Sequence, residues 1–170
     1  MQNKRGISQA FTAPPAPLEI RAATVFDVFA MSRILIASIR DLCQADHGGD
    51  SARIAEWTGS KTPEQIRGWI AGPGRYWLAE HGGEAAAVGG LSPDGSISLL
   101  YVAPVAAGRG TGAAMLAHLE AELLRQGHAE GRLDATRTAL DFYRKHGWEA
   151  AEETGGCCAT PCIPMRKALS

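Results

Sequence analysis

The chain has 170 residues, of which 45% are hydrophobic and 21% charged, and 17 basic against 18 acidic residues leave a formal net charge of -1. This composition is typical of one soluble globular domain with a sizeable core. The balanced charge offers no field for nucleic acid or an anionic membrane, and the four cysteines are too few for a disulfide scaffold. Fibrous, disordered, membrane-spanning and disulfide-stapled proteins are therefore excluded.

Residues 1–17 are expected to form a flexible tail before a single domain over residues 18–170. The tail contains Pro14, Pro15 and Pro17, which favour an extended, solvated backbone. Its basic start is not followed by the apolar run of a secretory signal, and no stretch approaches the roughly 20 apolar residues of a membrane span. We therefore expect a cytoplasmic protein with no membrane partner.

The first half of the domain is predicted to contain a strand over residues 18–21 and then helices. Thr24 and Asp27 have the spacing of a capping box. Apolar residues then recur every three or four positions and predict a helix, with Val28, Met31, Leu35, Ile39 and Leu42 on one face. The polar stretch 44–50 is expected to end this helix, and one or two shorter helices follow over 51–71.

The second half is predicted to contain a three-stranded meander and then alternating strands and helices. The meander strands cover residues 75–80, 85–91 and 96–102, with glycine-containing turns between them. A glycine-rich loop then leads into a helix that ends at Gly127, with Met115, Leu116, Leu119, Leu123 and Leu124 on one face. A strand near 132–134, a helix over 138–146 and a hairpin of 148–152 with 163–168 complete an α/β chain with a mixed sheet.

Gly108, Gly110 and Gly112 occupy alternate positions where the predicted helix begins. A backbone without Cβ atoms can bring successive N–H groups close to a bulky anion, and a helix N-terminus adds unpaired donors and its dipole. Arg109 adds a charged fork to this loop. The pattern indicates a pyrophosphate site, although a glycine-rich turn without a ligand has the same spacing.

Two other phosphate-binding motifs fit this loop less well. A dinucleotide-binding loop follows its strand tightly, whereas five residues separate Val102 from Gly108. Asp134 stands where such a fold places its ribose-binding acid, so an NAD-dependent oxidoreductase remains a remote alternative. A P-loop needs a Lys-Ser or Lys-Thr pair after its glycines, and none is present here.

Residues 100–116 resemble motif A of the GNAT N-acetyltransferase superfamily, because Leu-Tyr-Val-Ala-Pro is followed by Gly-Arg-Gly-Thr-Gly and then Met-Leu. Residues 139–148 read Ala-Leu-Asp-Phe-Tyr-Arg-Lys-His-Gly-Trp and resemble the second signature of that family. Both motifs stand in the family's order. The resemblance implies a three-layer GNAT-like fold, with a mixed, mostly antiparallel seven-stranded sheet flanked by helices.

The resemblance also implies an acyltransferase that uses acetyl-CoA as co-substrate and no metal. Tyr143 matches the family's tyrosine that protonates the leaving thiolate after direct attack by an amine, so Cys43 need not be a nucleophile. A backbone amide near Val102 would polarise the acetyl carbonyl. The residues implied in acetyl-CoA binding are Leu100, Tyr101, Val102, Ala107, Gly108, Arg109, Gly110, Thr111, Gly112 and Thr136.

The sequence departs from the family pattern at three positions. Ala107 stands where an arginine or glutamine is common, which leaves Arg109 to supply the side-chain contact with the CoA phosphates. Thr136 stands where many members have a pantetheine-binding asparagine. Pro164 lies in the predicted last strand, where a missing amide is tolerated only at the strand's start or edge. These departures bear on affinity for CoA rather than on the fold.

Candidates for the general base lie in the segment that lines the acceptor pocket of related folds: Asp46, His47, Asp50 and Glu56. Each is more commonly a solvated loop residue. Three tryptophans could shape an apolar acceptor pocket, but packing is the more common role: Trp57, Trp69 and Trp77.

Other groups with metal-binding or titratable side chains carry no functional expectation. The cluster of Cys157, Cys158 and Cys162 is a poor zinc site, because adjacent cysteines do not easily turn both thiolates inward. His118 and His128 are expected to be solvated.

The sequence thus predicts an N-acetyltransferase that moves an acetyl group from acetyl-CoA to the primary amine of a small molecule or peptide. The alternative is a non-catalytic acyl-CoA-binding or sensing domain, in which the glycine loop survives without the chemistry. The pattern does not name the acceptor or fix the length of the acyl group. A homodimer fits the resemblance, although no exposed apolar stripe demands one.

Overall fold

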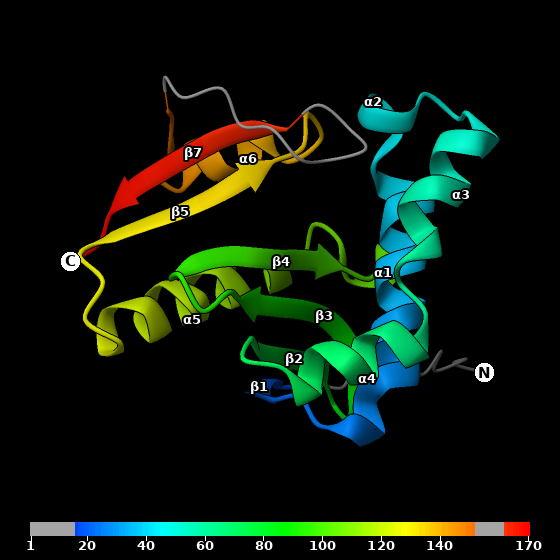
Figure 1. Cartoon of the computed structure of the whole chain (residues 1–170), viewed down its shortest axis with the longest axis horizontal. Coiled ribbons are helices and arrows are strands. Elements are labelled where there is room, and N and C mark those ends of the chain that lie inside the picture. Colours follow the sequence, from blue (N-terminus) through cyan, green and yellow to red (C-terminus); the bar gives the residue numbers. More distant parts are fainter. Residues whose placement is uncertain (1–15, 152–161) are drawn as a thin grey trace, which may run out of the picture.

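The computed structural model describes residues 16–151 and 162–170. Within them, a seven-stranded sheet has the order β1-β2-β3-β4-β5-β7-β6, with β4 and β5 parallel and the other neighbours antiparallel (Figure 1). The strands are β1 (Leu18–Ala22), β2 (Arg75–His81), β3 (Glu84–Leu91), β4 (Ser96–Val102), β5 (Glu130–Ala135), β6 (Glu149–Ala150) and β7 (Ile163–Ala168). The predicted mixed, mostly antiparallel sheet is confirmed.

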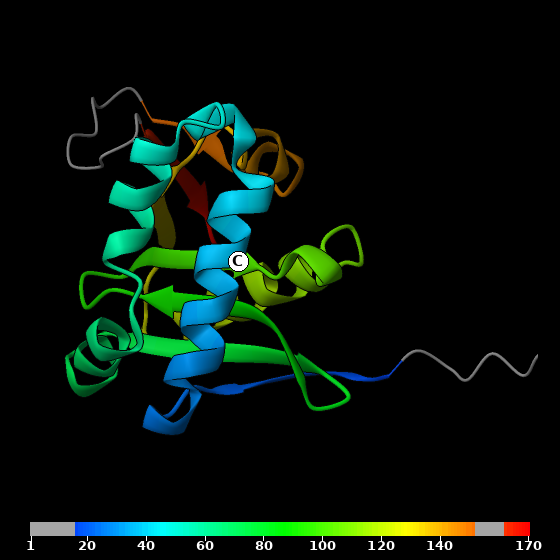
Figure 2. The same cartoon turned by 90° about the vertical axis from the view of Figure 1, so that its right-hand side faces the viewer.

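Helices cover both faces of the sheet and make the predicted three layers. On one face α1 (Val28–Leu42) and α4 (Pro63–Ala71) pack with Leu78 and Val88 of the sheet. On the other face α5 (Thr111–Arg125) and α6 (Leu140–Lys145) pack with Leu133 and Met165. The short helices α2 (Gln44–His47) and α3 (Ser51–Gly59) connect α1 to α4. Figure 2 shows α1 crossing in front of the central strands.

The capping box predicted at Thr24 and Asp27 is present, and it caps a 3₁₀ turn, η1 (Val25–Asp27), that runs directly into α1. Oδ2 of Asp27 accepts the Thr24 backbone N–H at 2.7 Å and the Thr24 hydroxyl at 3.0 Å. Arg21 of β1 donates to the same carboxylate and holds its pKa at about 2. The start of α1 is therefore tied to the sheet by hydrogen bonds as well as by its buried face.

Glycines allow α5 and Trp148 to lie very close to the sheet. A Cβ added at Gly89 of β3 would lie 2.6 Å from Sδ of Met115 in α5, and one at Gly131 of β5 would lie 2.8 Å from Trp148. Larger residues at either position would push these neighbours away. The predicted apolar face of α5 is buried except at Leu124, which is 38% exposed because it lies one position, about 100°, around the helix from the buried Leu123.

Three boundaries differ from the sequence-based expectation. The stretch 44–50 contains α2 instead of only a loop. The last helix begins at Leu140 rather than residue 138, because residues 137–139 form a turn with hydrogen bonds from Ala139 N to Thr136 O and from Leu140 N to Arg137 O. In the terminal hairpin β6 is only two residues long. Pro164 is the second residue of β7, near the strand start where a missing amide is tolerated.

Some expectations fall outside the described ranges. The predicted tail lies outside the described ranges except for residues 16 and 17. Cys157 and Cys158 also lie outside them. Within residues 16–151 and 162–170, no helix is long and apolar enough to cross a membrane.

Candidate active site

Strands β4 and β5 pair at only two positions and then separate, which opens a wedge in the middle of the sheet (Figure 1). The paired positions are Ser96 with Arg132 and Ile97 with Leu133. Beyond them, the edge of β4 that faces β5 continues from Ser98 to Val102 without a strand partner. Such an edge presents backbone N–H and C=O groups in the pattern that an extended ligand can pair with.

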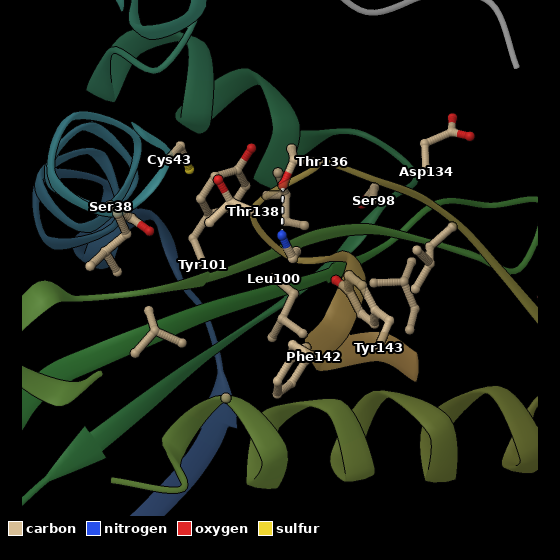
Figure 3. Close-up of a pocket in the computed structure, with 17 residues that line it drawn as sticks. Ser38, Cys43, Ser98, Leu100, Tyr101, Asp134, Thr136, Thr138, Phe142 and Tyr143 are labelled. Atoms are coloured by element: carbon tan, nitrogen blue, oxygen red, sulfur yellow. Dashed lines mark hydrogen bonds between the residues drawn. The ribbon is translucent and has the colours of Figure 1, made fainter. Parts of the chain in front are cut away.

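A bulge in β4 changes the direction of its side chains at the wedge. Leu99 lies opposite Gly90 of β3 while Ile97 lies opposite Leu91, so Ser98 is an extra residue on β4. Past the bulge, Leu100 packs with the α5 side of the core and Tyr101 with the α1 side. Figure 3 shows these two side chains on opposite sides of β4. Bulges of this kind bend a strand, and β4 pairs with β5 only before the bulge, whereas its pairing with β3 continues beyond it.

A cavity of about 200 Å³ occupies the wedge. It is lined from one side by the end of α1, from below by β4 and the start of α5, and from the other side by β5 and the turn before α6 (Figure 3). Of the sequence-predicted residues, the lining includes Leu100, Tyr101, Val102, Gly112, Thr136 and Tyr143. The fold thus brings the two sequence motifs to one cavity, although 22 residues lie between the end of the first at residue 116 and the start of the second at residue 139.

The glycine loop lies at the surface and leaves amide groups without helical partners. Gly108 and Gly110 have φ of +72° and +81°, a conformation that favours glycine. The first hydrogen bond that reaches α5 runs from Ala114 N to Gly110 O, so the amides of the first turn have no partner within the helix. Ala107 and Arg109 are exposed in the same loop. The loop can therefore direct several N–H groups and a cation at an anion.

Thr111 has a structural contact that the sequence did not indicate. Its side chain is 1% exposed, and its hydroxyl lies 2.9 Å from Nε2 of His81 at the end of β2. His81 therefore ties the first turn of α5 to the sheet. No local pattern predicts this contact, because the two residues lie 30 positions apart.

Tyr143 lines the cavity from α6 and is 6% exposed. Its ring makes edge contacts with Phe142 and Trp148, at centroid distances of 5.2 and 6.0 Å. Burial, with a smaller contribution from Tyr101, raises the pKa of Tyr143 well above its usual value. The phenol is therefore protonated throughout the neutral range and can donate a proton in the cavity.

Thr136 lines the cavity at the start of the turn before α6. Its hydroxyl accepts a hydrogen bond from Ala139 N at 3.3 Å (Figure 3). The hydroxyl can still donate one hydrogen bond.

Two of the four general-base candidates, Asp46 and His47, are buried and hydrogen-bonded within the protein, contrary to the expectation of solvated loop residues. Nδ1 of His47 accepts the N–H of Gly49 and its Nε2 lies 2.9 Å from the carbonyl of Ile39. This pairing requires the neutral tautomer with its proton on Nε2. Asp46 accepts hydrogen bonds from the turn before α6.

The other two candidates are exposed. Asp50 caps α3 by accepting from Ala52 N and Arg53 N, and Glu56 lies on the outer surface of α3. None of the four residues lines the cavity. Among the described residues that do line it, Asp134 is the charged one, and its side chain is exposed at the cavity edge (Figure 3).

The tryptophans serve mainly in packing. Trp77 is buried with its ring against His118, and Trp69 stacks on Tyr76. None of the three candidate tryptophans lines the cavity. The expectation that His118 and His128 are solvated is wrong, because both are partly buried, His118 against Trp77 and His128 against Gly95.

Cys43 lines the cavity but is not poised as a nucleophile. It is 6% exposed, and burial together with the nearby Asp46 raises its pKa to about 12. The reactive thiolate is therefore scarce at neutral pH. Within residues 16–151 and 162–170, no three His, Cys, Asp or Glu side chains are grouped so that they could hold a metal ion.

The comparisons with known proteins agree with this geometry. A family model for the acetyltransferase (GNAT) domain matches residues 43–169. No curated protein sequence matches the chain. Because the family model covers most of the chain, the chain belongs to the GNAT acetyltransferase family and is an acyltransferase.

Solved structures extend the match to most of the chain. A GCN5-related N-acetyltransferase from Rhodopseudomonas palustris is 22% identical, with 95% of this chain and 100% of that one covered and a TM-score of 0.79. The PaiA N-acetyltransferase from Thermoplasma acidophilum, solved in complex with coenzyme A, is 17% identical, with 90% and 99% covered and a TM-score of 0.76. N-acetylglutamate synthase from Neisseria gonorrhoeae, complexed with coenzyme A and N-acetyl-glutamate, is 17% identical, with 93% and 36% covered and a TM-score of 0.63.

Proposed function

We propose that the protein transfers the acetyl group of acetyl-CoA directly to the primary amine of a small molecule or peptide. The observation that carries this proposal is the placement of Tyr143 in the wedge whose other wall is the part of β4 beyond its pairing with β5. The glycine loop lies at the start of α5, which lines the same cavity through Gly112. Support also comes from the two similar structures solved with coenzyme A.

The donor would lie along β4 with its phosphates at the glycine loop. Backbone groups of Leu100, Tyr101 and Val102 would pair with the pantetheine arm as an added strand does. Amides over residues 108–112 would hold the pyrophosphate, and Arg109 would add a charge-assisted contact. The free donor capacity of the Thr136 hydroxyl suits a carbonyl of the arm. An exposed loop and an apolar wedge match the polar and apolar ends of this ligand.

Two groups of the protein would take part in the reaction. A backbone amide of β4 near Val102 would stabilise the oxyanion as the amine attacks the carbonyl. Tyr143 would then give its phenolic proton to the sulfur as the carbon–sulfur bond breaks. The nitrogen that attacked would lose its extra proton to solvent, and the tyrosinate would regain a proton from solvent. Because Cys43 is protonated and buried, transfer needs no acyl-enzyme. The exposed carboxylate of Asp134 at the cavity edge would favour binding of an amine that arrives as an ammonium ion over binding of an anionic acceptor. The ammonium must lose one proton to solvent before its nitrogen can attack.

The test is release of free thiol from acetyl-CoA by the purified protein with a panel of primary amines, including a polyamine, an amino acid and a peptide. We expect at least one amine to release thiol above the rate without protein, and CoA to raise the melting temperature as a ligand of the folded state does. Stabilisation by CoA without turnover of any amine would favour the non-catalytic binding domain. Stabilisation by NADH and not by CoA would contradict the proposal altogether.

A further inference from the structure

Asp46 is buried at the end of α2, 8% exposed, and its carboxylate holds a segment that is remote in sequence. Oδ1 accepts the backbone N–H of Arg137 at 2.8 Å. Oδ2 accepts the backbone N–H of Thr138 at 3.1 Å and also its hydroxyl, at 2.5 Å. An aspartate that accepts two successive amides and a hydroxyl acts as the cap of a helical turn, here from 91 residues away.

The segment that Asp46 holds is the link between the cavity wall and Tyr143. The turn of residues 136–139 places Thr136, Thr138 and Ala139 in the cavity lining. It continues into α6 through the hydrogen bond from Tyr143 N to Ala139 O at 3.1 Å. A shift of this turn would therefore move the Tyr143 side chain relative to β4.

The helix that carries Asp46 is itself fixed. The next residue, His47, is 1% exposed and bonds through one ring nitrogen to the carbonyl of Ile39 in α1 and through the other to the N–H of Gly49. α2 is thus locked to the end of α1. His47 therefore anchors α2 to α1, and Asp46, its neighbour in the chain, bonds to the turn before α6.

We propose that Asp46 is a positioning residue for acetyl transfer, which holds the turn of residues 136–139 so that the Tyr143 hydroxyl faces the β4 edge across the cavity. The inference rests on the proposed function. It assigns a role in turnover to a residue that touches neither substrate. If Asp46 had a purely structural role, its replacement would lower only the stability of the fold. If Asp46 positions Tyr143, its replacement lowers kcat even in protein that is fully folded.

The variant Asp46→Asn keeps the side-chain size but replaces one acceptor oxygen by a donor NH₂, which opposes the donors of Thr138. Because a misplacement of about 1 Å can cost about 100-fold in rate, we expect kcat to fall about 10- to 100-fold. The Kd for CoA should change by less than about fivefold, since the phosphate loop does not contact Asp46. Hydrogen exchange of the backbone amides over residues 137–143 should accelerate.

Asp27→Asn is the matched control. Asp27 also caps a helical turn by accepting a backbone N–H and a hydroxyl, both from Thr24, and it lies at the other end of α1, outside the cavity lining. Asp27→Asn makes the same carboxylate-to-amide change, so it should lower the melting temperature but leave kcat within about twofold of the wild-type value. A second variant, Thr138→Val, removes the hydroxyl and keeps the side-chain shape, so the inference remains testable if Asp46→Asn does not fold.

The outcomes separate the inference from the function on which it rests. If folded Asp46→Asn protein has the wild-type kcat, the positioning role is overturned and the proposed function stands. The same holds if Thr138→Val has the wild-type kcat although hydrogen exchange of its amides over residues 137–143 is faster. No thiol release by the wild-type protein would overturn both. If Asp46 acts through Thr138, Asp46→Asn combined with Thr138→Val should lower kcat no further than Asp46→Asn alone.

Discussion

Tyr143→Phe is expected to lower kcat about 100-fold or more, because general acid catalysis contributes about 10²- to 10⁴-fold. The change removes one hydroxyl and retains the ring that packs against Phe142 and Trp148. Without that hydroxyl the thiolate would leave unprotonated, into a cavity where burial disfavours charge. Steady-state thiol release with saturating amine measures kcat, and calorimetric titration with CoA should give a Kd within about threefold of wild type.

Tyr76→Phe is the control for this substitution. Tyr76 is also partly buried with a raised pKa, but it does not line the cavity and its loss should leave kcat within about twofold. Because burial raises the pKa of Tyr143 well above its usual range, the wild-type rate should not fall through phenol ionisation up to about pH 10. Equal kcat values for Tyr143→Phe and the wild-type protein would remove Tyr143 from the mechanism.

Gly110→Val is expected to raise the Kd for CoA about 100-fold. A β-branched residue is an outlier at a φ of +81°, so the loop must change conformation, and its amides would turn away from the pyrophosphate. Hydrogen bonds to charged groups contribute about 1.5–3 kcal/mol each, so losing one or two of them accounts for about 100-fold. Calorimetric titration with CoA measures the effect.

Gly83→Val has the same backbone strain at a site away from the cavity. Gly83 lies in the β2–β3 turn with a φ of +86°, and a Cβ there, as at Gly110, would meet no atom within 4 Å. Both variants should lose similar stability, and only Gly110→Val should lose affinity. Equal Kd values for Gly83→Val and Gly110→Val would show that the glycine loop does not bind the phosphates.

Local sequence signals predicted the elements that local physics determines. Thr24 with Asp27 marked the start of α1, and the apolar spacing from Val28 to Ile39 identified its buried face. Glycines at alternate positions marked the loop before α5. The number of strands came only from the family resemblance, and the sheet order was not predicted, because the insertion of β7 between β5 and β6 has no counterpart in hydrophobic periodicity.

The parts of the site that the sequence missed all depend on contacts between distant segments. Asp46 was predicted to be a solvated loop residue, but it is buried against a turn 91 positions away. His81 reaches Thr111 from another strand. The bulge at Ser98 that opens the wedge follows from pairing with β3. Residue type and spacing along the chain contain no signal for such pairings.

A crystal structure of the protein with bound CoA tests the central claim most directly. The account predicts the pantetheine arm between β4 and β5, hydrogen-bonded to backbone groups of Leu100, Tyr101 and Val102. It also predicts the pyrophosphate on amides of the loop from Gly108 to Gly112, and the sulfur within hydrogen-bond distance of the Tyr143 hydroxyl. CoA bound outside the wedge, or with its sulfur remote from Tyr143, would contradict the account.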